Sequence, residues 1–440
     1  MILADLRLRL QVAVPLAWLL MCGCGQQDPA GARTAIQAGS QASDLNFPET
    51  AEEIVSKTCS IGAKPKVAVE VFLGPIEIVA GNDETIHVTV TKRAGGKTKE
   101  AAQATLKEIS LTVDEKPDGI RIVAEPPRGK PFSGGVGAKL EVPQGARLDL
   151  KTNLDRIAVA GIHGAVRAQN SQGPIIVKGA RGAQNLTTNL AGIEVEGPSD
   201  QINATNSQGG IIVRGAKGTI ELSTSLAEVD VDAPVTKAMI KNSQGPISIR
   251  NATGTLDLST NLATIDVNAP CTQVTAKNSQ GPITVTGAKG PVKLTTNLGD
   301  IVISGAGKDV EAVNSQGGIA IQGATGRIKA KTSMAQLTVE ARDAVIDAEN
   351  SQGGVTFSGS LASGKHSFKA SLGNISLTLP AQASFQIDAT ASLGTIANAF
   401  PLAKTEKSTD TRLVGTVGAK PKTTIQANVD QGSVTIEKGK

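Results

Sequence analysis

Acidic side chains recur on one face of several short predicted strands, where they could do chemistry. Two carboxylates beside a cleft suit glycoside hydrolysis, and a polysaccharide lyase needs carboxylates for Ca²⁺ together with a base. The set comprises Glu194, Glu196, Glu228, Asp230, Asp232 and Asp266. Lys178, Arg214 and Arg250 are interleaved with these acids, and no Tyr is present to stack a sugar. The sequence therefore predicts no catalytic residue and no enzyme, with a lyase or glycosidase as the enzymatic alternative.

The residues that usually bind metals or act as nucleophiles are dispersed. His87, His163 and His366 lie far apart, and we expect each to be an exposed bystander. Cys59 and Cys271 have no neighbouring His or Cys at metal-ligand spacing, and we expect them to be unbridged. No phosphate-binding or hydrolase motif occurs, so we expect no metal and no cofactor. With 44 basic and 40 acidic residues, the chain also lacks the charge excess of a nucleic-acid-binding protein.

Two Asn-containing markers recur along the chain with a strict period. Asn-Ser-Gln-Gly returns every 36 residues, and Thr-Asn-Leu or a close variant falls between its copies at intervals of 17 and 19. Stacked identical turns would bring Asn side chains above one another, where donors and acceptors can bond along the stack. The expected turn ladder comprises Asn153, Asn170, Asn189, Asn206, Asn242, Asn261, Asn278, Asn297, Asn314 and Asn350.

The elements that carry these markers are pairs of short strands. Ile175 and Val177 alternate with Ile176 and Lys178, and a second strand is expected at 184–188. The fold class is therefore all-β, a parallel β-solenoid with about 18 residues per coil, paired as 36-residue repeats. A coil of this length fits either two sheets or three, and the handedness stays open.

Outward-facing charges alternate from one predicted coil to the next. Opposite charges on neighbouring strands stabilise a sheet by roughly 0.2–1 kcal/mol per pair. We expect such columns to set the register and to keep the surface soluble. We expect Lys178 to contact Glu196 and Arg214 to contact Asp232, and on the other sheet Lys293, Glu311, Lys329 and Asp347 alternate in charge in the same way.

The flanking segments depart from the repeat and are expected to cap it, because an open solenoid end exposes strand edges. Residues 52–145 are predicted as an N-terminal β cap with the first coils and one short helix near 97–108. Residues 146–375 form the regular solenoid, and 376–440 form the C-terminal coils and cap. Within that cap, 403–422 is expected to be a loop or mobile hairpin.

The N-terminus resembles that of bacterial lipoproteins. Arg7 and Arg9 precede an apolar run at 12–21 that is too short to span a bilayer. The end of this run, Leu-Met-Cys-Gly-Cys at 20–24, resembles a lipobox, which implies a signal peptide at 1–24 and lipidation of Cys24, with Cys22 the poorer match. In that family an Asp after the lipidated Cys indicates retention in the inner membrane. Gly25 at this position therefore implies that the protein is delivered to the outer membrane. Residues 25–50 are small and polar and are predicted to be a flexible linker.

Several motifs of the folded part resemble the bacterial putative-adhesin domains, a family of β-solenoids of mostly unknown function. They are Leu-Glu-Val-Pro at 140–143, Leu-Asp-Leu at 148–150, and the closing segments 376–380, 392–396 and 431–436. The likeness covers roughly residues 60–438. It implies a binding or scaffold role and provides no catalytic residues.

The sequence thus predicts a non-enzymatic lipoprotein of the bacterial cell envelope, facing the periplasm or the exterior. Its expected partners are the membrane, through the lipid anchor, and a surface protein or glycan, with no nucleic acid. A self-assembling envelope scaffold is the third possibility, because stackable solenoids can polymerise, as in the bactofilin-like cytoskeletal proteins that the chain loosely resembles.

Overall fold

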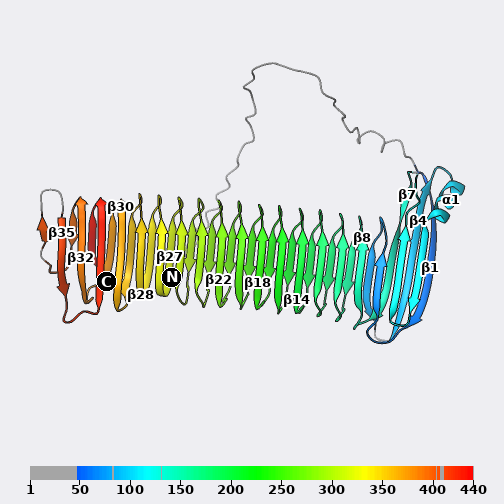
Figure 1. Ribbon diagram of the computed structural model, residues 1–440, viewed down its shortest axis with the longest axis horizontal. Helices are drawn as coiled ribbons and strands as arrows, with labels where there is room; N and C mark the ends of the chain where they lie inside the picture. Colours follow the sequence, from blue (N-terminus) through cyan, green and yellow to red (C-terminus); the bar gives the residue numbers. More distant parts are fainter. Residues whose placement is uncertain (1–46, 82–83, 130, 403, 407–410, 440) are drawn as a thin grey trace, which may run out of the picture. The chain divides into compact units, whose positions relative to one another are not determined.

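A regular stack of two-stranded coils makes up the body of the protein (Figure 1). The computed structural model describes residues 47–81, 84–129, 131–402, 404–406 and 411–439. Equivalent residues of successive coils are 18 positions apart, and all strands of the body pair in parallel, as Ile175 does with Ile193. The prediction of an all-β parallel solenoid with 18-residue coils is therefore confirmed.

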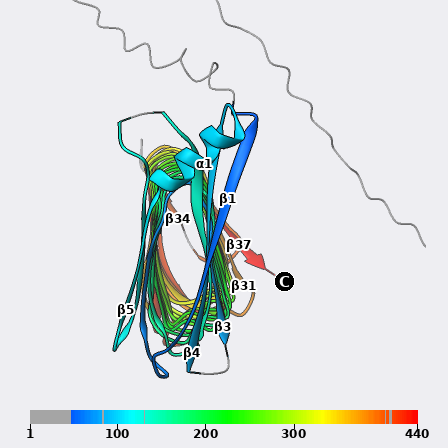
Figure 2. The ribbon, with the colours of Figure 1, turned by 90° about the vertical axis from the view of Figure 1, so that its right-hand side faces the viewer.

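The two strands of each coil belong to two sheets, so the coil is flattened (Figure 2). Sheet A contains β8 (Arg147–Thr152), β10 (Val166–Asn170), β12 (Gln184–Thr188), β14 (Gln201–Asn206), β16 (Thr219–Thr224), β18 (Lys237–Asn242), β20 (Thr255–Thr260), β22 (Gln273–Asn278), β24 (Val292–Thr296) and β26 (Val310–Asn314). Sheet B contains β9 (Ile157–Ala160), β11 (Ile175–Lys178), β13 (Ile193–Glu196), β15 (Ile211–Arg214), β17 (Val229–Asp232), β19 (Ile247–Arg250), β21 (Ile265–Asn268), β23 (Ile283–Thr286) and β25 (Ile301–Ser304).

Further coils extend the stack toward the C-terminus. β27 (Ile319–Thr332) and β28 (Leu337–Asn350) each run through both sheets, because β27 pairs with β25 and with β26. β29 (Val355–Leu361), β30 (Gly364–Leu372) and β31 (Ile375–Pro380) follow. Bulges interrupt the pairing of β27 with β28, and they bend both strands around the corner between the sheets.

The core is a thin layer of aliphatic side chains between the sheets. Strand alternation sends Ile175 and Val177 inward and leaves Lys178 exposed, and Leu186 closes the layer from sheet A. Ala or another small residue occupies the corner after sheet B, where Ala180 and Ala216 are fully buried. Burial of about 25 cal/mol per Å² of apolar surface stabilises such a stack without aromatic residues.

The N-terminal cap is built around a coil that is out of sequence order. β2 (Lys66–Glu70) lies between β6 (Gly119–Glu125) and β8, and β3 (Ile76–Gly81) lies between β7 (Ser133–Pro143) and β9. Antiparallel strands then finish the end: β4 (Thr85–Gly96) pairs with β7, β1 (Glu49–Ser60) with β4, and β5 (Ser110–Lys116) with β6. The helix α1 (Lys99–Glu108) begins where the Thr98 hydroxyl accepts a bond from the Ala101 N–H.

The C-terminal cap repeats this arrangement. β36 (Thr423–Gln431) lies between β30 and β32 (Phe385–Leu393), and β37 (Val434–Gly439) lies between β31 and β33 (Ile396–Asn398). β35 (Thr411–Val417) pairs antiparallel with β32 and with β34 (Lys404–Glu406), so the segment expected to be a loop or hairpin contains paired strands. Buried Phe rings pack in pairs at this end, Phe357 on Phe368 and Phe385 on Phe400.

The lipidation site Cys24 and the signal peptide 1–24 lie outside the described residues, as does most of the linker 25–50. β1 begins at Glu49, just inside the end expected for that linker. Among the described residues, no helix is long and apolar enough to span a bilayer.

Candidate functional site

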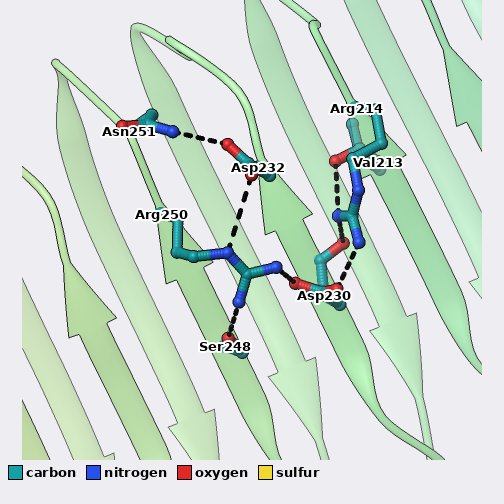
Figure 3. A network of polar contacts seen from close by, with 7 residues as sticks. All are labelled: Val213, Arg214, Asp230, Asp232, Ser248, Arg250 and Asn251. Carbon is teal, nitrogen blue, oxygen red and sulfur yellow. Dashed lines mark hydrogen bonds and ion pairs between the residues drawn. The ribbon is translucent and has the colours of Figure 1, made fainter.

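Two acids of the cluster that could do chemistry, Asp230 and Asp232, lie on sheet B in contact with arginines (Figure 3). Asp230 accepts hydrogen bonds from an arginine on each of the two adjacent strands, Arg214 of β15 and Arg250 of β19, the latter at 2.7 Å. Arg250 also lies 3.6 Å from Asp232, which accepts a 2.6 Å bond from the Asn251 amide. Asp230 is only 17% exposed, so both arginines are needed to compensate its burial.

The strand register of the charge columns agrees with the prediction from the sequence. Only some of the expected ion-pair partners are in contact. Lys178 lies 3.2 Å from Glu196 and 3.5 Å from Glu194, and the hydrogen bond to Glu196 raises the pKa of Lys178. The expected contact of Lys178 with Glu196 is thus confirmed. In the alternating column of sheet A, Lys293 forms an ion pair with Glu311 at 2.8 Å.

The expected contact of Arg214 with Asp232 is wrong, and one further pair of opposite charges in register is also not an ion pair. Arg214 is opposite Asp232 in the strand register, as expected, but its guanidinium bonds Asp230 instead. The reason is that Asp230 and Asp232 both point outward from β17, and the Asn251 amide and Arg250 already occupy Asp232. Lys329 is opposite Asp347, yet the ion pair forms two residues further along the strand, between Lys331 and Glu349 at 2.9 Å.

The chemistry of this surface is that of closed ion pairs. Within the part of the chain that the structure describes, no group of three His, Cys, Asp or Glu side chains is placed to hold a metal ion. Cys59 and Cys271 are both buried and free, as expected, and burial raises the pKa of Cys271 to about 11. A thiol with this pKa is almost entirely protonated at neutral pH and is a poor nucleophile.

The expectation that all three histidines are exposed is wrong for His366, which is 1% exposed. Its Nδ1 accepts a 3.2 Å bond from the Ile346 N–H, and its Nε2 lies 2.9 Å from the Ala362 carbonyl oxygen. Burial lowers the pKa of His366. The signal in the sequence was its alternation with Phe368, two residues later in β30, which places both side chains on the same inward face.

The marker asparagines occupy two adjacent turn positions and do not form one column, which corrects the expected ladder. Asn170 pairs in register with Thr152, and Asn206 with Thr188. The buried position of each turn therefore alternates between Asn and Thr. We call this set the buried corner column: Thr152, Asn170, Thr188, Asn206, Thr224, Asn242, Thr260, Asn278, Thr296, Asn314, Thr332 and Asn350.

Each residue of the buried corner column bonds the main chain of the preceding coil, where the sequence suggested Asn-to-Asn bonds. The Asn242 amide donates to the Ala227 carbonyl at 2.7 Å, and its oxygen accepts from the N–H groups of Gln244 and Gly245. The Thr260 hydroxyl donates to the Gly245 carbonyl at 3.1 Å in the same way. These bonds satisfy turn groups that no strand partner reaches.

The other marker asparagines lie one position later in the turn, on the surface. They comprise Asn153, Asn189, Asn261 and Asn297. Asn153 accepts a 2.8 Å bond from the Leu73 N–H in the cap, and Asn189 accepts a 3.4 Å bond from the Ser207 hydroxyl in the next coil. The intervals of 17 and 19 arise because the two markers sit at different positions of one 18-residue coil.

A row of exposed apolar side chains follows the same corner, and sequence reasoning missed it. These residues are Leu154, Leu190, Leu226, Leu262, Leu298 and Met334, each 44–51% exposed. They recur every 36 residues, and Gln occupies the same position in the intervening coils. The Leu of the Thr-Asn-Leu marker could have predicted this row. It follows the turn Asn and so lies outside the buried strand, where packing in the core does not account for it.

A groove of about 360 Å³ lies beside the N-terminal cap, among β3, β4 and β7. Glu77 on its wall is ion-paired with Arg156, and Arg93 is hydrogen-bonded to Glu52 at 2.8 Å. These charges are therefore compensated within the protein, like those of sheet B.

Comparison with known proteins places this solenoid in a family. A family model matches residues 66–437. The chain belongs to the Toastrack DUF4097 family. The match spans the regular coils and both inserted coils, and it agrees with the resemblance to bacterial β-solenoid domains noted in the sequence.

No curated protein matches the Toastrack chain significantly. A solved structure, described as a putative cell adhesion protein from Clostridium sporogenes ATCC 15579, matches 89% of this chain and 100% of its own at 10% identity. Its TM-score is 0.15, which is too low to support an argument about this chain.

Proposed function

We propose that this Toastrack protein is a non-enzymatic scaffold or adhesion module of the bacterial cell envelope, tethered to the outer membrane by a lipid on Cys24. The observation that carries the proposal is the closed ion-pair network of sheet B. Asp230, the most buried acid of the cluster, is held between Arg214 and Arg250 and accepts bonds from both. Both carboxylate oxygens of Asp230 are therefore already bonded to guanidinium groups of the protein.

The same network argues against the polysaccharide-active alternative. A glycosidase needs one carboxyl group with a raised pKa beside a second carboxylate, and a lyase needs a free base. Lys178 holds both Glu194 and Glu196, and Arg250 contacts both Asp230 and Asp232. Incubating the purified protein with acidic and neutral polysaccharides, with and without Ca²⁺, should release no product. Product formation that Asp230→Asn abolishes would overturn the non-enzymatic assignment.

Anchoring and exposure can be tested in cells that express the full chain. Cys24→Ser should move the protein from the membrane fraction to the soluble fraction, whereas Cys22→Ser should leave it in the membrane. Protease added to intact cells should degrade the protein if it faces the exterior. Protection from protease would restrict the role to a periplasmic scaffold, and an unchanged membrane fraction for Cys24→Ser would contradict the lipid anchor.

A further inference from the structure

The exposed corner that follows sheet A is uncharged over eleven successive coils. We define the corner ribbon as three turn positions in each coil. They are residues 171–173, 189–191, 207–209, 225–227, 243–245, 261–263, 279–281, 297–299, 315–317, 333–335 and 351–353. At the chain's average of 19% charged residues, these 33 positions would hold about six charged side chains, and they hold none. These three positions therefore carry no charge, although both sheets beside them carry ion pairs and the next position of the turn is acidic in two coils, at Glu228 and Asp300.

Apolar and polar side chains also alternate regularly along the ribbon. Leu190, Leu226, Leu262 and Leu298 project from alternate coils, each 44–46% exposed. Gln takes the same position in the coils between them. Coils are about 4.8 Å apart, so the apolar side chains recur at about 9.6 Å along a straight line. Isolated exposed Leu residues need no explanation, but an uncharged apolar row this long is typical of an interaction surface.

We propose that the corner ribbon is a lateral contact between two copies of this chain, arranged in parallel and in register. A partner that meets every Leu must repeat at the spacing of the coils, and a second copy does so over the full length. A two-fold axis along the stack places each Leu against the same Leu and each Gln against the same Gln. The absence of charge at the ribbon positions removes most of the repulsion that identical facing surfaces would otherwise suffer.

The parallel direction rests on the proposed function, because copies tethered by Cys24 to one membrane share an orientation.

The ribbon is about 48 Å long and about 10 Å wide by the spacings of coils and sheets, so it buries roughly 500 Å² per partner. Stable complexes bury about 800 Å² per partner. The contact is therefore weak in dilute solution, and it forms where tethering raises the local concentration.

Disulfide cross-linking of the full chain in isolated membranes tests the pairing. Gln172→Cys lies at one end of the ribbon, where identical residues meet only in the parallel arrangement. Mild oxidation should give a dimer, while the matched exposed position Lys217→Cys, on the opposite corner, should not. The native Cys59 and Cys271 are 2% and 0% exposed and do not interfere. Absence of the Gln172→Cys dimer, or equal dimer from Lys217→Cys, would overturn the proposal.

Charge substitution at the centre of the ribbon tests register. Leu262→Glu places like charges face to face, and we expect at least a tenfold loss of the Gln172→Cys dimer. Val302→Glu is the matched control, because Val302 is 37% exposed on sheet B and away from the ribbon. Coexpressing Leu262→Glu with Leu262→Lys chains should restore the dimer between them, because opposite charges then meet at the same level. No loss with Leu262→Glu, or a loss that the Lys chain does not rescue, would contradict in-register pairing.

The pairing and the lipid anchor can fail independently in these experiments. If Cys24→Ser leaves the protein in the membrane fraction, the anchor is wrong, and dimers of the purified chain at high concentration still support pairing. If anchoring holds and no ribbon dimer forms in membranes or in the purified chain, the ribbon is not a contact between copies.

Discussion

At the residue scale, the most regular side chains of this protein hold its turns together. The buried corner column alternates Asn and Thr, and both types donate to a carbonyl of the preceding coil. Asn does more than Thr, because its oxygen also accepts two N–H groups of its own turn. A buried polar group left without a partner costs about 1–3 kcal/mol, so each column residue supports a local free-energy contribution of that order.

Asn242→Ala should destabilise the protein by about 3 kcal/mol. The substitution leaves the Ala227 carbonyl and the N–H groups of Gln244 and Gly245 without their partner. The stability of Asn242→Thr should lie between those of the native chain and of Asn242→Ala. The Thr hydroxyl restores the donor to the Ala227 carbonyl, but the acceptor for the two N–H groups is lost. The control is Ser243→Ala at the next, exposed position, which should stay within about 0.5 kcal/mol. Thermal unfolding of the variants measures this order, and equal effects of Asn242→Ala and Ser243→Ala would contradict it.

His366 should make the protein less stable in mild acid. Because burial lowers the pKa of His366 in the folded state, the unfolded chain binds a proton first as pH falls below about 6.5. Stability contributed by the neutral ring is then complete above pH 6.5 and is lost progressively below it. Unfolding midpoints at pH 7.5 and 5.5 measure the loss. His366→Gln should reduce this pH dependence, whereas the exposed-site variant His163→Gln should keep it; identical profiles would refute the role of His366.

The sequence predicts which residues of the candidate site lie opposite each other, because the strand register determines this. It does not predict which of them form ion pairs. Alternation along the strands places Lys178 beside Glu196 and Arg214 beside Asp232, and the structure keeps both registers. The choice of Asp230 by Arg214 could not be predicted, because it depends on the hydrogen bonds that other side chains make to Asp232. The Leu row was visible in the sequence, but a periodic Leu is normally read as core.

At the element scale, both ends of the solenoid use the same device. The first coil, β2 with β3, and the last coil, β36 with β37, are each inserted one place in from the end of the stack. Antiparallel strands then cover the outermost coil at each end. A terminal segment that is paired on both edges resists fraying, and the antiparallel strands cover the outward edges of β6, β7 and β32.

Coil length and strand alternation were predictable from the sequence, since the repeat fixes both. The inserted coils were not. β36 alternates buried and exposed residues as any body strand does, so its pattern suits a position after β33 as well as one between β30 and β32. The two possible places of β36 in the stack differ in the strand pairing of the whole cap. No local sequence pattern reflects that difference.

Ile425→Asp should release the inserted C-terminal coil and leave the regular coils intact. Ile425 is fully buried and pairs with His366 on one side and Ile387 on the other, so a charge there is buried without a partner. Limited trypsin digestion should then cut after Lys422 and Lys365, with the segment 147–332 remaining resistant. The exposed neighbour supplies the control, Gln426→Ala, which should be cut no faster than the native chain. Simultaneous digestion of the whole solenoid would show instead that the cap and body unfold as one unit.

At the scale of the whole molecule, the 36-residue period has a steric cause. Coils repeat every 18 residues, but the turns alternate between an Asn type that ends in Gly and a Thr type that usually ends in Ala. A Cβ at Gly209 would lie 2.3 Å from the Ala191 carbonyl oxygen and 2.7 Å from Nδ2 of Asn206. The Asn that reaches across to the preceding coil therefore requires Gly three residues later, whereas the shorter Thr tolerates Ala.

Deleting residues 207–242 should give a shorter, stable solenoid, because Asn206 is then followed by Ser243, Gln244 and Gly245. Deleting only 207–224 removes one coil and keeps the strand register, but it joins Asn206 to a turn that ends in Ala227. The added methyl group should lower the free energy of unfolding by about 1–3 kcal/mol, the usual cost of overpacking. Adding Ala227→Gly to this shorter deletion should recover most of that loss. Thermal unfolding of the three chains decides the matter: if the 18-residue deletion is as stable as the 36-residue deletion without the Gly, the alternation of turn types does not set the period.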